Sequence, residues 1–160
     1  MKRTTTTTRA TPHAGGSTAD NEMHPILPPQ YSARLFRSSF TTSLSVAMAS
    51  YHRLWLCAAL ALMVLATSLN YWRHPVRGWR RNVDMAAVFM GMSHHIYYSS
   101  YVTDRTYQAF YLLLVAKTMY CYSRARKAHC KNTSSAWHCT MHIIGNIANM
   151  LLYTGLGGAV

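Results

Sequence analysis

The apolar positions of this chain gather in four segments, at about residues 54–71, 83–101, 106–122 and 137–156. The first segment has the strongest pattern. Its stretch from Leu54 to Ala66 carries no charge, and about twenty such residues span the hydrocarbon core of a bilayer. Tyr51 and Trp55 flank it on one side and Tyr71 and Trp72 on the other, as aromatic residues do at membrane interfaces. The pattern predicts an all-α, polytopic membrane helix bundle with about four transmembrane helices.

The other three apolar segments contain polar residues. Residues 83–101 include Asp84, His94 and His95, and Lys117 lies near the end of the segment 106–122, where a long side chain reaches the interface. Residues 137–156 are uncharged if their histidines are neutral. Because polar side chains are costly in lipid, we expect them to face one another inside the bundle.

The N-terminal region has a different composition. Residues 1–37 are rich in Thr, Pro and basic residues, and such a segment buries too little apolar surface to offset its ordering entropy. We expect a disordered tail over 1–37 and the bundle over 38–160. The basic, hydroxyl-rich stretch that begins at Arg34 is also typical of an organelle transit peptide, which would direct the chain to a mitochondrial membrane. Asp20 and Glu22 favour a plain solvated tail instead.

Basic residues dominate the charge, with 16 Lys and Arg against 4 Asp and Glu and a formal net charge of +12. Eight of them form two clusters between apolar segments, Arg73, Arg77, Arg80 and Arg81, and Arg124, Arg126, Lys127 and Lys131. This loop spacing disfavours nucleic acid as a partner and favours the lipid bilayer. With four crossings both loops face the cytoplasm or matrix and both termini lie opposite, which the basic N-terminal region opposes, so the orientation stays open.

A polar row follows the last apolar segment at helical spacing. Its members are His138, His142, Asn146, Asn149 and Tyr153. Steps of three and four residues put them on one helix face, which we expect to point into the bundle. A second row, of Tyr107, Tyr111, Thr118 and Tyr122, lies on the preceding segment. Hydrogen bonds between these two rows would hold the helices together.

Two histidines of that row, His138 and His142, are candidate metal ligands, because imidazoles four residues apart reach one ion. The connectivity brings Ser68 and Asp84 to about the same depth. Asp84 is then a third metal ligand, a partner that orients a histidine, or half of an ordinary ion pair with Arg80 or Arg81. We assign no role to His94 and His95.

These residues resemble the superfamily of the alkaline ceramidases, the progestin and adipoQ receptors and the haemolysin III proteins. The matching positions are Ser68, Asp84 after a basic loop, and His138-x-x-x-His142. The resemblance implies a seven-helix fold, zinc held by three histidines and, in the ceramidase branch, hydrolysis of lipid amides by zinc-activated water. The chain departs from the pattern in having Trp72 where the first motif has its His, and in having too few helices.

We expect a small membrane protein without enzymatic activity, an accessory or assembly component whose partners are the bilayer and other membrane subunits, with no cofactor. The alternative is a zinc-dependent membrane hydrolase, in which His138, His142 and Asp84 bind the metal while Asp84 and Ser68 take catalytic roles. A proton or small-solute conduit lined by the polar row is a further alternative. Whether the chain is an enzyme is left open.

Overall fold

A computed structural model describes residues 25–157, which are helical and contain no strand. The elements are α2 (Pro29–Ser39), α3 (Thr42–Tyr51), α4 (Trp55–Arg73), α5 (Trp79–Tyr98), the short 3-10 helix η1 (Ser99–Tyr101), α6 (Arg105–Lys127) and α7 (Lys131–Gly157). The predicted all-α fold and helical bundle are confirmed over these residues. The four apolar segments lie within or overlap α4, α5 with η1, α6 and α7.

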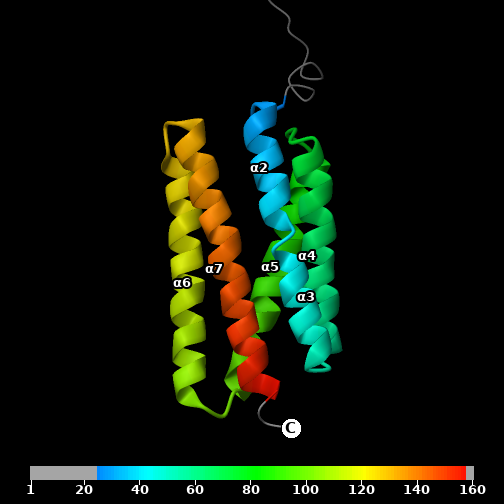
Figure 1. The fold of residues 1–160 in the computed structure, drawn as a ribbon, viewed down its shortest axis with the longest axis vertical. Helices are drawn as coiled ribbons and strands as arrows, with labels where there is room; N and C mark the ends of the chain where they lie inside the picture. The colour runs from blue at the N-terminus through cyan, green and yellow to red at the C-terminus, as the bar shows by residue number, and fades with distance from the viewer. Residues whose placement is uncertain (1–24, 158–160) are drawn as a thin grey trace, which may run out of the picture.

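The helices run up and down along one axis (Figure 1). The start of α2, the α4–α5 loop and the α6–α7 loop lie at one end, which we call the basic end. The α3–α4 loop, η1 and the end of α7 lie at the other, which we call the C-terminal end. A hydrogen bond of 2.8 Å from Ile26 N–H to the Pro75 carbonyl, and one of 3.2 Å from the Arg34 guanidinium to Asn132, join the segments at the basic end.

The helices α2 and α3 follow each other in one direction and cross the bundle once between them. Both pack against α4 and α7. The predicted disorder over 1–37 is therefore wrong for residues 29–37, whereas residues 1–24 lie outside the described part. Small polar side chains explain the error, because two of the three buried residues of α2 are serines, Ser32 and Ser39, and composition alone does not mark serine as core.

Local signals begin and end these helices. Pro29 occupies the first turn of α2, where its fixed φ and missing N–H cost nothing. The Asp104 carboxylate accepts a hydrogen bond of 2.7 Å from the Thr106 N–H and caps α6. Gly78 precedes α5 with a φ of 154°, which a side chain would disfavour.

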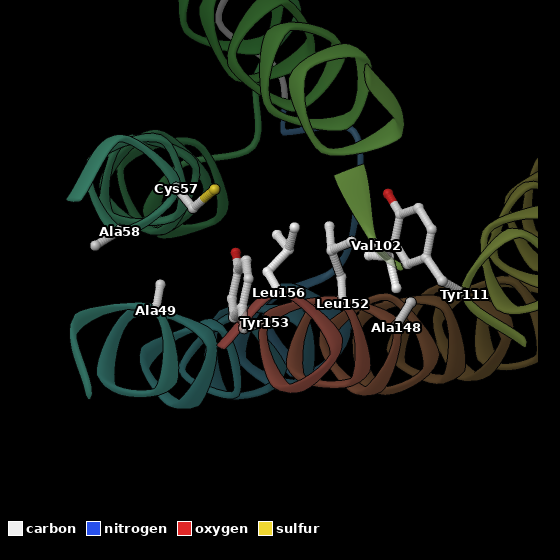
Figure 2. Close-up of a cluster of buried hydrophobic side chains, with 9 residues drawn as sticks. All are labelled: Ala49, Cys57, Ala58, Val102, Tyr111, Ala148, Leu152, Tyr153 and Leu156. Carbon is white, nitrogen blue, oxygen red and sulfur yellow. The ribbon is translucent and has the colours of Figure 1, made fainter. Parts of the chain in front are cut away.

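Apolar packing is concentrated towards the C-terminal end. Figure 2 shows a cluster in which Tyr153, Leu152 and Leu156 of α7 meet Cys57 of α4 and Val102. A smaller cluster of Leu35, Tyr71 and Trp72 lies nearer the basic end. Because the two clusters occupy different levels, the space between α4–α5 and α6–α7 is not packed throughout.

Large apolar side chains also cover the outside of the bundle. Among the most exposed are Tyr51, Trp55, Trp79, Phe89, Tyr97 and Leu113. By length and composition, α4 is nevertheless the one described helix that qualifies as a candidate membrane span. The helices α5, α6 and α7 do not qualify, and their polar and basic residues, such as Arg80, Arg81 and Arg124, lower their mean hydropathy.

Candidate functional site: the interhelical cavity

A cavity of about 310 Å³ lies between α4, α5, α6 and α7. Its polar lining includes Ser68, Asp84, His95, Tyr122, His138 and His142. All four candidate site residues of the sequence therefore line one cavity, although they come from three helices. The order of the helices places these residues at about one depth, and helix periodicity directs their side chains inward.

Asp84 lies on the cavity wall with hydroxyl partners. Its side chain is 8% exposed, and its Oδ1 accepts hydrogen bonds from Ser68 Oγ at 2.6 Å and Thr67 Oγ1 at 3.2 Å. The expected ion pair with Arg80 or Arg81 is wrong, because within residues 25–157 no basic nitrogen lies within 4.0 Å of this carboxylate. Both arginines are in the first turn of α5, while Asp84 is on the face that meets α4.

His138 and His142 lie together on α7, with ring centroids 5.0 Å apart. Trp72, which stands where the resemblance has a histidine, packs its indole edge-on against His138 with centroids 5.1 Å apart. The indole N–H is a donor only and cannot ligate a metal. Trp72 thus fills, with an aromatic ring, space beside the imidazole pair.

The donor set does not fit the zinc centre that the resemblance implies. Within the described residues no group of three or more His, Cys, Asp and Glu side chains can hold a metal ion. His138 and His142 therefore form a pair that Asp84 does not complete, whereas a catalytic zinc takes three protein ligands.

Asn146 is the most extensively bonded polar side chain of α7. Its oxygen accepts from Ser45 Oγ at 2.6 Å, and its amide nitrogen donates to Thr41 Oγ1 at 3.0 Å and Thr42 Oγ1 at 3.3 Å. The amide also donates to the His142 carbonyl at 2.7 Å. The expected tyrosine partners from α6 are replaced by hydroxyls of α3 and the residue before it.

The sequence analysis did not predict that the hydroxyls of Thr41, Thr42 and Ser45 would be the partners of Asn146. The available signal was a row of buried residues at helical spacing, all small except Leu35, namely Ser32, Leu35, Ser39, Thr42, Ser45 and Ala49. It was overlooked because serine and threonine are common in loops and tails as well as in close helix contacts.

His95 and Tyr153 form a second buried contact, near the C-terminal end of the cavity. The Tyr153 hydroxyl lies 2.8 Å from His95 Nε2, and the two side chains are 0% and 4% exposed. The neighbouring His94 leaves its buried Nε2 without a hydrogen-bond partner in the described residues. The polar row of α7 thus ends in a link to α5, which explains why His95 faces inward.

The whole polar row of α7 has the orientation that its spacing predicts. Asn146 and Tyr153 are buried, whereas Ile143 and Ile147 on the opposite face are half exposed. On α6, Tyr111 is buried and Thr118 and Tyr122 line the cavity. Thr118 donates to its own helix, to the Leu114 carbonyl at 2.8 Å, so the two rows share the cavity without bonding to each other there.

Comparisons of the chain with protein-family models, curated proteins and solved structures find no match.

Proposed function

We propose that this chain is a small multi-pass membrane protein that acts without enzymatic activity as an accessory or assembly component. The observation that carries the proposal is the apolar exterior of a bundle whose polar side chains point inward. Phe89 of α5 and Leu113 of α6 are 66% and 63% exposed, and Ile147 of α7 is 50% exposed. Exposing such a surface to water costs a free energy of about 25 cal/mol per Å², whereas exposing it to lipid does not.

The properties of α4 support the same proposal. A core helix of a soluble protein can be as long and as apolar as a membrane span, but it is then mostly buried. Only 33% of the most apolar stretch of α4 is buried inside the bundle. Its 19 residues extend about 28 Å at about 1.5 Å per residue, close to the thickness of a hydrocarbon core.

Exposed aromatic residues gather towards the C-terminal end of the bundle, where Tyr51, Trp55 and Tyr97 lie. Trp79 is exposed at the basic end. Aromatic residues are common where a membrane protein meets the surfaces of a bilayer.

The basic residues give the bundle a direction. Nine lie at the basic end, namely Arg34, Arg73, Arg77, Arg80, Arg81, Arg124, Arg126, Lys127 and Lys131. Arg53 and Arg105 lie at the other end, and Arg37 and Lys117 lie between the two ends. Because α2 and α3 add a fifth crossing, residue 25 is at the basic end and residue 157 is opposite. We infer that the basic end faces the cytoplasm or matrix.

An accessory role agrees with the chemistry of the cavity. Asp84 is engaged by two hydroxyl donors, and the imidazole pair lacks the third ligand that a hydrolytic zinc needs. The exposed apolar faces of α5 and α6 leave large areas for lipid or for another membrane subunit. The zinc hydrolase and the conduit remain the alternatives, and both would use the cavity residues His138 and His142.

Carbonate extraction tests the membrane proposal. The full chain should stay in the membrane pellet at alkaline pH and enter solution only with detergent. Recovery of a folded protein in the carbonate supernatant would overturn the proposal.

Metal analysis and native mass separate the accessory role from its alternatives. After purification in mild detergent, we expect no stoichiometric zinc, and we expect a mass above that of one chain. Zinc that is lost in the His138→Ala/His142→Ala double variant would favour the hydrolase. A strictly monomeric protein would count against an assembly role, and proton flux into liposomes that this variant abolishes would favour the conduit.

A further inference from the structure

Asp84 is a buried carboxylate whose partners are all neutral in the described structure. An ionised carboxylate only accepts hydrogen bonds and has room for about four, while Ser68 and Thr67 supply two, both to Oδ1. Burying a charge without a countercharge is costly. The cavity beside Asp84 is therefore suited to a ligand that brings a positive charge and N–H donors.

The cavity is long. It reaches along α5 from Asp84 to His95, eleven residues or about 16 Å at about 1.5 Å per residue. This length accommodates an extended, unbranched hydrocarbon chain.

The wall between the two ends is largely apolar. Ala61 and Val64 come from α4, Val88 and Met92 from α5, and Met141 from α7. Methionine side chains adapt their shape to a flexible chain at low cost. Asp84 is thus the one carboxylate among the lining residues and lies at one end of the cavity, and the apolar side chains between Asp84 and His95 are suited to methylene groups.

We propose that the cavity binds a single-chain aliphatic amine, with its ammonium group on Asp84 and its chain directed along α5 towards His95. A protonated amine supplies the charge and the donors that the carboxylate lacks. A fatty alcohol supplies a donor without the charge, and a fatty acid places a second negative charge beside Asp84, so both bind more weakly.

Such a ligand enters from the side of the bundle. Met85 and Phe89 on α5 and Met119 on α6 line the cavity and are also exposed, so the cavity reaches the outer surface between these helices. Only this route of entry rests on the proposed membrane location, because the bilayer is then the source of the amphiphile. The preference for an amine rests on Asp84 in either case.

Photolabelling of the full chain in nanodiscs of zwitterionic lipid tests the proposal. The probe is dodecylamine that carries a diazirine in its chain, and the competitors are dodecylamine, dodecanol and dodecanoate. We expect labelled peptides from the cavity wall and competition by the amine at about tenfold lower concentration than by the alcohol. Asp84→Asn should remove that advantage, because it keeps the shape of the side chain and removes its charge.

Two control variants address location and charge. Asp104→Asn makes the same change at the exposed cap of α6 and should leave the amine preference intact. Val115→Phe fills the chain region of the cavity and should reduce labelling several-fold while the helical circular dichroism is retained. Equal competition by amine and alcohol, a preference that survives Asp84→Asn, or labelling unchanged by Val115→Phe would each overturn the proposal. None of these outcomes would affect carbonate extraction.

Discussion

Asn146 is the residue that joins α7 to α3. Its amide group contacts three hydroxyls from residues 41–45, about a hundred positions earlier in the chain, and is 8% exposed. In apolar surroundings such bonds have no competing water, although measured values for interhelical hydrogen bonds in membranes average below about 1 kcal/mol. Several bonds on one side chain therefore add up to a specific but modest contribution.

We expect Asn146→Ala to lower the free energy of unfolding by about 1–2 kcal/mol, because it leaves the Ser45 hydroxyl without its acceptor. Titration with a denaturing detergent, followed by circular dichroism, measures the change. Asn149→Ala is the matched control, since Asn149 lies on the same helix and lines the cavity but makes no side-chain hydrogen bond within the described residues. Equal losses from both variants would contradict the assigned role of the hydroxyl network.

At the level of elements, the break between α2 and α3 determines how these two helices pack against α4 and α7. Hydroxyls of Ser38, Ser39 and Thr41 donate to carbonyls of the preceding turn, at 2.9, 3.0 and 2.7 Å. Such bonds bend helices. The bend lets α2 pack near the basic end and α3 near the C-terminal end, both between α4 and α7. Small buried residues then permit close approach along the whole crossing.

The contact between α7 and the η1–α6 connection is equally close. A Cβ on Gly155 would lie 3.1 Å from Val102 Cγ1 and 3.3 Å from Tyr107 Cβ. Gly155→Leu should therefore destabilise the bundle by about 1–3 kcal/mol through overpacking, despite the better helix propensity of leucine. The same detergent titration measures it. Thr154→Leu, at the exposed neighbouring position, should change the free energy of unfolding little. An equal loss in Thr154→Leu would contradict the assignment of the effect to the close contact at Gly155.

At the scale of the whole molecule, five crossings place the two ends of the described chain at opposite ends of the bundle. Charge then follows the same axis, with nine basic residues at one end and two at the other. In the membrane location that we propose, a four-helix bundle would leave Arg34 on the side opposite the two basic loops, against the positive-inside rule. The α2–α3 crossing instead places Arg34 at the same end as these loops.

Cys130 provides a direct test of the proposed orientation. It is exposed in the loop at the basic end, and hydrogen bonds from the backbone of Thr133 and then of Asn132 hold the pKa of its thiol below its ordinary value. The thiolate fraction at neutral pH is thereby raised, so Cys130 should react with maleimide faster than the buried Cys57 and Cys121.

We expect a membrane-impermeant maleimide to label Cys130 only from the cytoplasmic or matrix side. A cysteine at Thr103, in the loop between η1 and α6, reports on the other end. In a Cys130→Ser background, Thr103→Cys should be labelled only from the opposite side. Labelling of both positions from one side would contradict a crossing by α6, and equal labelling of Cys130 from both sides in sealed vesicles would contradict a fixed orientation.

The sequence by itself determined that the four apolar stretches are helical and which face of α7 turns inward. Asn146 and Tyr153 are buried and Ile143 and Ile147 are exposed, as their spacing requires. Both properties follow from the order of residues along one helix, because 3.6 residues per turn relate neighbours in the chain to positions on a face. Most of the candidate site was predictable for the same reason.

Only the tertiary structure decided which partner each inward side chain meets. Asp84 bonds to hydroxyls of α4 rather than to the arginines beside it in sequence, and Asn146 bonds to α3 rather than to the tyrosines of α6. The sequence pattern also does not predict that α2 and α3 form a crossing, because this crossing depends on how their buried residues pack against α4 and α7. Periodicity orients a side chain on its own helix, but distances between helices depend on how all their surfaces fit together.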